Sequence, residues 1–235
     1  MAKKSQSRVS IERIPTGIPG LDELIEGGFV KGSTVLVTGG TGTGKTTFCA
    51  QFIWEGLKRG EPGVYISLEE DVEDVKDDLK RFGFDFKRFE ESRIFRMLYQ
   101  NPFEVSDISS TIMDAINLVN AQRLVIDPIS LLGMYMKDPA ALRKRFFQIV
   151  RLLKRTGVTS LITSEILDED MGTQVRSLSR FGVVEFVVDG VIVLNLFGIG
   201  GGITRSILIR KMRRTKHGTD VYPMEITEKG IIIKK

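Results

Sequence analysis

The strongest chemical signal in the sequence is a glycine-rich segment at residues 39–46. It fills every fixed position of the phosphate-binding loop pattern G-x-x-x-x-G-K-[ST], in which glycines let successive backbone N–H groups turn toward one phosphate chain. We expect Lys45 to reach the β- and γ-phosphates of a nucleoside triphosphate and the Thr46 hydroxyl to hold Mg²⁺. The residues predicted to bind the nucleotide are Gly39, Gly40, Thr41, Gly42, Thr43, Gly44, Lys45, Thr46 and Thr47.

A second candidate is Asp127, which ends the apolar strand pattern at residues 123–127. Phosphate-loop enzymes use a carboxylate at such a strand end to anchor the magnesium shell. The alternative is an ordinary aspartate that caps a turn before Pro128. The presence of the loop, preceded by a buried-strand pattern at residues 33–38, favours the interpretation of Asp127 as a magnesium residue.

Two adjacent carboxylates, Glu69 and Glu70, follow the next strand pattern along the chain. Neutral water is a poor nucleophile toward a γ-phosphate, and a carboxylate beside it can orient it and accept its proton. Neighbouring residues of an extended chain face opposite sides, so we expect one glutamate to touch the water and the other to polarise its partner or hold a neighbouring subunit. The alternative is that both glutamates begin the acidic helix pattern at residues 71–82 and stabilise its N-terminus.

A third group is cationic and surrounds Lys211 and Arg213, close to the C-terminus. Three functions fit such a cluster: a nucleic-acid surface, a solvated edge strand, or cations that reach into a neighbour's nucleotide site. Spacing in the sequence does not choose among them. The other members of the cluster are Arg205, Arg210, Arg214 and Lys216.

These residues need a frame of alternating strands and helices to bring them together. Apolar periodicity predicts such a frame, and Lys45, Glu69, Asp127 and Ser164 each closely follow a predicted strand. Because ligands bind at the carboxyl ends of parallel strands, these four side chains can converge. We predict an α/β fold of the phosphate-loop NTPase type, with a mostly parallel sheet, helices on both faces and a C-terminal β-hairpin. The predicted strands are 35–38, 63–68, 94–98, 123–127, 159–164, 191–197, 203–211 and 230–233, and the predicted helices are 21–25, 47–59, 71–82, 106–120 and 139–155.

Composition limits the remaining functions. A chain of 235 residues with 42% hydrophobic residues can bury one large α/β core, which we place at residues 14–235 after a basic, flexible arm at residues 1–13. A single cysteine, Cys49, and a single histidine, His217, exclude thiolate cages, His-cluster metal sites and Ser-His catalysis. Acidic and amide residues interrupt the most apolar stretch, at 183–197, so we expect no membrane span and a cytoplasmic protein.

Taken together, the motifs resemble the KaiC-like branch of the RecA-fold ATPases. The resemblance extends from about residue 14 to residue 233, and the paired glutamates together with the cationic segment are its specific part. The segments that carry it are residues 16–28, 67–70, 81–85, 180–190 and 211–217, besides the phosphate-binding loop.

The resemblance implies an ATPase that binds ATP and Mg²⁺ and assembles as a ring of identical copies, commonly a hexamer, with ATP at the subunit interfaces. It implies that Lys211 and Arg213 approach the γ-phosphate from the adjacent subunit. It also implies that His217, Thr227 and Glu228 approach the sugar and base across the same interface. Arg214 departs from the pattern, because the family usually has glycine there.

Three functions follow for testing. The first is a ring-forming ATPase that regulates or moves a protein partner. The second is an ATP-dependent single-stranded DNA-binding protein related to RadA, although the hairpin tip at residues 198–202 has no aromatic side chain to stack on bases. The third is a nucleotide switch that binds ATP without hydrolysing it, against which the intact Glu69 and Glu70 argue.

Overall fold

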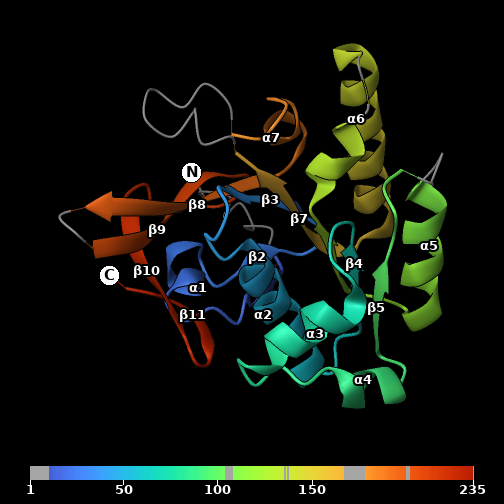
Figure 1. Ribbon diagram of the computed structural model, residues 1–235, viewed down its shortest axis with the longest axis horizontal. Coiled ribbons are helices and arrows are strands. Elements are labelled where there is room, and N and C mark those ends of the chain that lie inside the picture. Colours follow the sequence, from blue (N-terminus) through green and yellow to red (C-terminus); the bar gives the residue numbers. More distant parts are fainter. Residues whose placement is uncertain are drawn as a thin grey trace, which may run out of the picture.

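The computed structural model describes residues 11–103, 108–134, 136, 138–166, 178–199 and 202–234. Within these residues a nine-stranded sheet runs through the molecule in the order β11-β10-β9-β8-β3-β7-β6-β4-β5, with helices on both of its faces (Figure 1). The run from β8 to β5 is parallel, and β9, β10 and β11 extend it with antiparallel pairs. The strands are β3 (Thr34–Gly39), β4 (Gly63–Ser67), β5 (Phe95–Tyr99), β6 (Arg123–Asp127), β7 (Thr159–Glu165), β8 (Gly190–Ile199), β9 (Gly202–Met212), β10 (Val221–Thr227) and β11 (Gly230–Ile233), and a separate pair joins β1 (Arg13–Ile14) to β2 (Phe29–Val30).

Alternation of side chains along the strands divides the core into two layers. Val35 and Val37 of β3 face one layer and Leu36 faces the other, as the two-residue period of a strand requires. The first layer is covered by α1 (Leu21–Leu24), α2 (Lys45–Lys58), α3 (Val72–Lys80) and α4 (Lys87–Glu91), and the second by α5 (Ile108–Val119), α6 (Pro139–Thr156), α7 (Val184–Val187) and a 3₁₀ helix (Ile129–Gly133).

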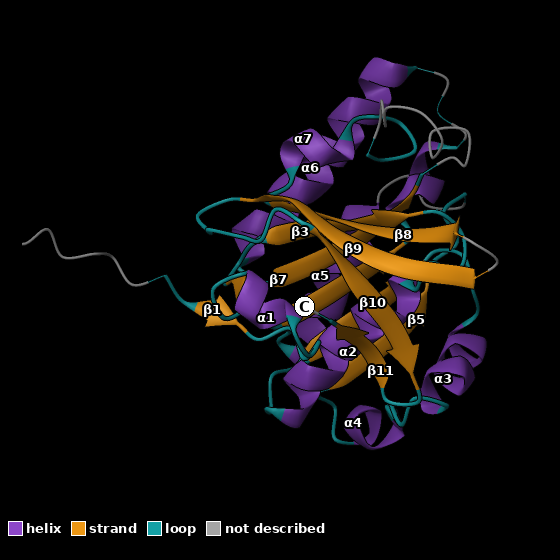
Figure 2. Cartoon of the chain, turned by 90° about the vertical axis from the view of Figure 1, so that its left-hand side faces the viewer, coloured by secondary structure: helices purple, strands orange, loops and turns teal. Residues whose placement is uncertain are grey.

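Figure 2 shows the strands between these two groups of helices. None of the helices in the described ranges is both long and apolar enough to cross a membrane.

The predicted fold class is confirmed, and most predicted elements lie within a few residues of their expected bounds. Helix α6 begins where the sequence suggests, because Asp138 accepts a hydrogen bond from the Ala140 N–H and Pro139 occupies the first helical turn. The elements not predicted from the sequence are α4, α7, β10, the short pair β1 and β2, and the 3₁₀ helix. Strand β10 is largely exposed and contains Pro223, so it carries neither a buried run nor a clear alternation.

The carboxyl ends of β3, β4, β6 and β7 lie together, as the predicted convergence of the site residues requires. Parallel register aligns Ser67 with Asp127 and Gly39 with Glu165. This register therefore brings the loop, the glutamate pair and Asp127 together at the carboxyl ends of the strands, as expected.

At the opposite end of β6, a fully buried arginine ties the sheet to the chain's start. Arg123 Nε lies 2.6 Å from Glu61 Oε2, and Arg123 Nη1 donates to the carbonyls of Pro15 and Phe52 at 2.9 and 2.7 Å. The side chain passes close to α2 at Gly56, where an added Cβ would lie 2.4 Å from Arg123 Cδ. A buried guanidinium of this kind is held in place by its partners, which themselves depend on it.

We predict that Arg123→Met lowers the free energy of unfolding by about 3–5 kcal/mol, because it leaves Glu61 and two backbone carbonyls without their donor. Urea unfolding followed by circular dichroism measures this change. Arg96→Met on the neighbouring part of the sheet is the matched control, because Arg96 is exposed. Equal midpoints for the two variants would contradict the structural role of Arg123.

Candidate active site

The glycine-rich loop joins β3 to α2 and takes the curled form that a phosphate chain requires. Gly39 lies so close to β8 that a Cβ there would be 2.3 Å from the Leu194 carbonyl oxygen. Gly44 has φ +100° and caps α2, a conformation that side chains other than glycine seldom adopt. The Thr43 hydroxyl donates to the Gly40 carbonyl at 2.9 Å and braces the loop from within. The loop thus directs the N-terminus of α2, which favours an anion, toward the space that the loop encloses.

Lys45 and Thr46 occupy the first turn of α2 and point to two different ends of the site. Lys45 Nζ donates to the carbonyls of Gly39 and Gly40 at 3.1 and 2.9 Å, so its ammonium group lies over the loop. The Thr46 hydroxyl donates to Asp127 Oδ2 at 2.8 Å. Thr46 and Asp127 are 81 positions apart in the sequence, and the ends of β3 and β6 bring them into contact.

Asp127 is buried, and hydroxyl groups surround its carboxylate. Besides Thr46, the Tyr65 hydroxyl donates to Oδ2 at 2.5 Å and the Thr163 hydroxyl donates to Oδ1. Burial and the neighbouring Asp127 carboxylate raise the pKa of the Tyr65 hydroxyl, which keeps it a donor. One carboxylate oxygen beside one threonine hydroxyl is a ligand set that suits Mg²⁺, a hard cation that prefers oxygen and keeps several of its waters. The donor set therefore fits the magnesium expected at this place.

Glu69 and Glu70 stand between β4 and α3, at the edge of a small cavity. The Ser67 hydroxyl donates to the Glu70 carbonyl at 2.5 Å and accepts from the Glu70 N–H at 3.1 Å, which fixes the turn. Helix α3 begins only at Val72, with Asp71 as its cap, so the glutamates lie outside the helix. The lining residues of the cavity are Thr46, Ser67, Glu69, Glu70, Val75, Asp127 and Pro128.

Partial burial, together with neighbouring carboxylates, raises the pKa of both glutamates. Partial burial raises the pKa of Glu69, and the carboxylates of Glu165, Asp127 and Glu70 raise it further, while Lys45 opposes them. Partial burial and Asp127 likewise raise the pKa of Glu70. A carboxylate with a raised pKa is a stronger base than a free glutamate, which suits it to accept a proton from water.

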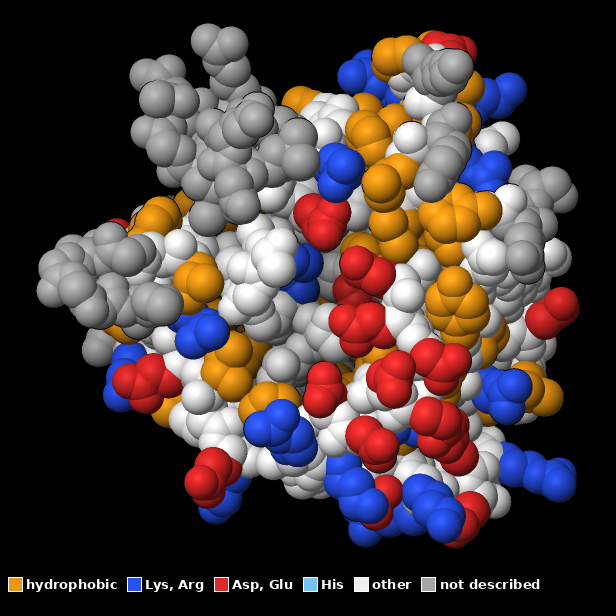
Figure 3. Space-filling model, viewed as in Figure 1, with side chains coloured by type: hydrophobic (Ala, Val, Ile, Leu, Met, Phe, Trp, Pro, Cys, Tyr) orange, Lys and Arg blue, Asp and Glu red, His pale blue; other side chains and the backbone are white. Residues whose placement is uncertain are grey.

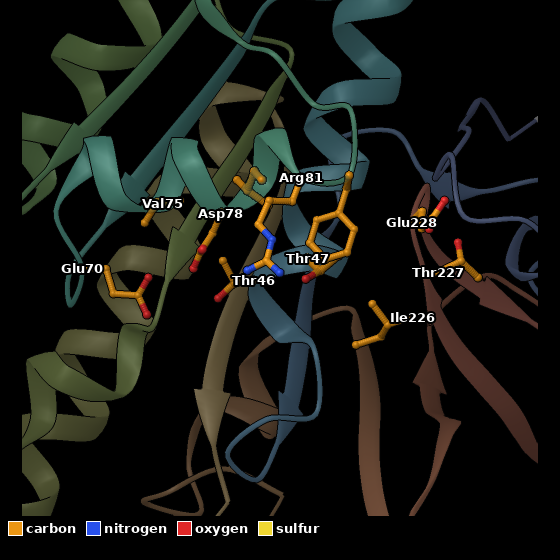
Figure 4. A pocket seen from close by; sticks show the side chains of 11 residues that line it. Thr46, Thr47, Glu70, Val75, Asp78, Arg81, Ile226, Thr227 and Glu228 are labelled. Atoms are coloured by element: carbon orange, nitrogen blue, oxygen red, sulfur yellow. The ribbon is translucent and has the colours of Figure 1, made fainter.

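A larger cleft of about 550 Å³ opens beside the first turn of α2 (Figure 4). Thr46 and Thr47 lie at its centre, with Glu70 and Asp78 toward one side and Thr227 toward the other. The remaining lining residues are Val75, Leu79, Arg81, Phe82, Ile226 and Glu228.

The cleft includes two of the residues that the family resemblance places at a subunit interface. Thr227 and Glu228 line the cleft of their own chain, and not only a surface that faces a neighbour. The cause is β10, which lies close to the loop: a Cβ on Gly44 would be 2.9 Å from Ile226 Cδ1. The Thr227 hydroxyl also accepts the Lys229 N–H and donates to the Gly230 carbonyl, so it shapes the turn between β10 and β11.

Lys211 and Arg213 lie near the opposite end of the strands from the loop. Strand β9 ends at Met212, which pairs with Gly190, and Gly190 pairs in turn with Val35 near the start of β3. From there β3 runs for roughly 13 Å before the loop begins. Neither cation is therefore level with the loop of its own chain.

Both cations are held by groups near the start of β8. Lys211 Nζ donates to the carbonyls of Glu185 and Val188 at 3.0 and 2.8 Å, and Arg213 Nη1 lies 3.7 Å from Asp189 Oδ1. Partial burial and the adjacent Arg213 lower the pKa of Lys211. The side chain of Arg213 is about half exposed, at 52%.

The segment after β9 keeps the backbone shape that glycine favours, although it contains arginine. Arg214 has φ +58°, in the left-handed region, and Arg13 supports this turn by donating to the Arg214 carbonyl and the Thr215 hydroxyl at 3.1 and 3.0 Å. His217 is half-buried, with Nδ1 2.8 Å from the Gly218 carbonyl oxygen, and it does not line the described cleft.

Residues at this site that were not selected from the sequence as site residues include Tyr65, Arg81, Phe82, Thr163 and Glu165. Two of them had a usable signal. Tyr65 and Thr163 are polar residues inside buried strand patterns, and a buried hydroxyl needs a hydrogen-bond partner. The others depend on where a turn or a strand end lies in space, which a single sequence does not give.

Comparison with known proteins agrees with this geometry. A family model described as the KaiC ATPase matches residues 14–235. A UPF0273 protein of Methanopyrus kandleri is 36% identical over 242 residues, covering 95% of this chain and 92% of that protein, and one of Thermotoga maritima is 38% identical, covering 95% and 96%. The crystal structure of a KaiC-like protein from Pyrococcus horikoshii superposes with a TM-score of 0.87 at 40% identity, covering 96% of this chain and all of that one.

We predict that Asp127→Asn weakens ATP binding in the presence of Mg²⁺ by about 10- to 100-fold, and Thr163→Val by a smaller factor within that range. Binding without the metal should change little, because neither residue is part of the loop. Fluorescence titration with and without Mg²⁺ measures the difference. Thr159→Val, at the other end of β7, is the matched control; a similar loss in that variant, or no loss in Asp127→Asn, would refute the magnesium assignment.

Proposed function

The chain belongs to the KaiC family of ATPases, and we propose that it hydrolyses ATP, with Mg²⁺, at sites shared between identical copies in a closed ring, and that turnover regulates a protein partner. In this proposal residues 14–235 act as one domain of a cytoplasmic protein, and residues 1–13 form an arm. The observation that carries the proposal is the contact of the Thr46 hydroxyl with the buried Asp127 carboxylate, beside Lys45 and Glu69.

The loop and the cleft would divide the nucleotide between them. The backbone N–H groups of residues 39–47 and the Lys45 ammonium group would bind the phosphate chain. Magnesium, held by Thr46 and Asp127, would supply positive charge to the β- and γ-phosphate oxygens. The cleft that continues past Thr47 would take the sugar and base, between Phe82 on one side and Ile226 to Glu228 on the other.

Glu69 is the better placed of the two glutamates to orient the attacking water. Lys45 acts on the pKa of Glu69 but is not among the groups that shift the pKa of Glu70, whereas Asp127 acts on both. The neighbours that act on Glu70 are Asp127 and the acidic residues of α3. We therefore assign Glu69 to the water, and Glu70 to holding the turn through Ser67 and polarising its partner.

Opposite charges at the two ends of the parallel strands support a head-to-tail arrangement, in which the acidic end of one copy faces the basic end of the next. Seven acidic residues fall within positions 69–78, and Figure 3 shows acidic side chains gathered over α3 and the adjoining cleft. At the other end Lys154, Lys211 and Arg213 lie around Asp189, which accepts from Lys154 Nζ at 2.9 Å. Contacts between unlike faces close into rings when the rotation permits it. Lys211 and Arg213 would then reach the γ-phosphate bound by the next copy, with His217 nearby.

The described cations of the β8–β9 hairpin give less support to DNA binding. Arg205 Nη2 donates to the Gly42 carbonyl of the loop at 3.3 Å, and Lys211 donates to two carbonyls. These contacts engage Arg205 and Lys211, which leaves fewer exposed cations, such as Arg210 and Arg213, for a phosphate backbone. We therefore favour a protein partner over single-stranded DNA.

We predict that Lys45→Ala abolishes phosphate release. Arg213→Ala should slow it by a factor on the order of 10³ or more. Mixed and reassembled in equal amounts, the two inactive variants should recover activity, because about a quarter of the shared sites then combine an intact loop with an intact Arg213. The control is a mixture of Lys45→Ala with the Lys45→Ala/Arg213→Ala double variant, which can form no complete site. A first mixture as inactive as the control would rule out shared sites.

We predict a pH dependence governed by Glu69, which must be deprotonated to accept a proton. Since its pKa is raised, kcat should fall on the acid side at a higher pH than a free glutamate would give, about 4.3. Glu165→Gln removes a nearby negative charge, lowers the pKa of Glu69 and should shift this acid limb to lower pH. The measurement is kcat at saturating ATP from pH 4 to pH 8; an unshifted or upward-shifted limb would remove Glu69 from this role.

A further inference from the structure

An ion pair at the end of β7 contains an arginine, Arg180, to which the proposed reaction assigns no role. Arg180 Nη1 lies 2.9 Å from Glu165 Oε2, and the Arg180 N–H is 3.3 Å from the Ser164 hydroxyl. Both side chains are only partly buried, at 28% and 27% exposed. The pair therefore remains accessible to solvent and to a small ligand.

Its position in the sheet places this pair next to the phosphate-binding loop. Glu165 pairs with Gly39, the last residue of β3 and the first of the loop, and the Ile166 N–H donates to the Gly39 carbonyl at 3.3 Å. Neighbouring strands lie about 4.8 Å apart. Lys45 Nζ binds that same Gly39 carbonyl, so the Glu165–Arg180 pair and the Lys45 ammonium group flank one point of the chain.

Two cations and two carboxylates lie around this point of the chain. Glu165 acts on the Glu69 carboxylate, as does Lys45, so Glu69 lies within electrostatic reach of both. Arg180 thus provides a cation on the side of β7, in addition to Lys45 on the side of α2. A guanidinium group binds phosphate oxygens through two parallel N–H donors, and it does so as readily as it binds a carboxylate.

We propose that Arg180 senses the γ-phosphate: Glu165 holds its guanidinium group beside the loop, and the γ-phosphate of ATP takes that group from Glu165. The inference rests on the proposed function, since it assigns a further residue to the same site. ADP lacks the phosphate that would compete with Glu165, so Arg180 stays paired when ADP is bound. The exchange of partners makes the ion pair a reporter of which nucleotide occupies the site.

Partial exposure explains why the exchange can run in both directions. An ion pair that water can reach is held weakly, and a phosphate group with two negative charges attracts a guanidinium group more strongly than one carboxylate does. After hydrolysis and loss of phosphate, Glu165 is the neighbouring anion to which Arg180 returns. No bond is made or broken in this step beyond hydrogen bonds and the ion pair.

The test compares the affinities for Mg·ATP and Mg·ADP, measured by calorimetry on the full chain. Arg180→Ala should weaken ATP binding by about tenfold and leave ADP binding within about twofold, because only ATP gains the arginine. Glu165→Gln should have the opposite sign and raise the ratio of ATP affinity to ADP affinity, because it frees Arg180. Arg180→Lys should recover part of the ATP preference.

A purely structural role for the pair gives different results. Both Arg180→Ala and Glu165→Gln would then lower the melting temperature and weaken ATP and ADP binding alike, which would overturn the inference. Arg59→Ala is the matched control, since Arg59 forms a partly exposed ion pair with Glu55 at the far end of α2; it should leave the ratio unchanged. If Arg180→Ala does not fold, the opposite signs of Arg180→Lys and Glu165→Gln carry the test.

Failure of the inference is distinguishable from failure of the proposed function. Wild-type protein that binds neither nucleotide would contradict both. Wild-type protein that prefers ATP, with the same preference in Arg180→Ala, would contradict the sensing role alone.

Discussion

The site depends on one partly buried interaction, the hydrogen bond between the Thr46 hydroxyl and the buried Asp127 carboxylate. It links the helix that follows the loop to a strand that lies two positions away in the sheet, so it requires β3, β7 and β6 to be in correct register. A buried carboxylate is costly unless hydrogen bonds surround it, and Tyr65 and Thr163 provide them. In our proposal these contacts fix two of the oxygen ligands of a magnesium ion before any nucleotide binds.

The same sheet brings several carboxylates together at this end of its strands. The cluster of carboxylates around Glu69 and Glu70 repels a triphosphate, and Lys45 is the cation that the loop itself supplies. Lys211 and Arg213 are directed to the other end by β9, where Asp189 and the carbonyls of α7 hold them. An arrangement of copies in which one end meets the other neutralises both faces, and it explains why a single chain is an incomplete enzyme in our proposal.

The sequence predicted the part of the fold that local rules determine. The glycine pattern, the buried strand before it and the periodic helices follow from backbone freedom and side-chain burial, and all of them are found in the structure. Strand β10 was missed because it is exposed and contains Pro223, and with it the placement of Thr227 and Glu228 within their own chain's cleft. Glu165 and Arg180 were missed for a related reason: their pairing depends on how β7 and the segment before α7 approach each other in space. The left-handed backbone at Arg214 shows that a turn shaped for glycine can persist when neighbours such as Arg13 support it.

The central claim is that one chain builds a cradle for Mg·ATP and an identical chain completes it. A crystal structure of the assembled protein with Mg²⁺ and a non-hydrolysable ATP analogue tests this most directly. Our account requires the metal to lie against the Thr46 hydroxyl and the Asp127 carboxylate, with Lys211 and Arg213 of the adjacent copy in hydrogen-bond contact with the γ-phosphate. Ordered nucleotide in a cleft that no neighbouring copy approaches, or a ring in which those two cations face solvent, would contradict it.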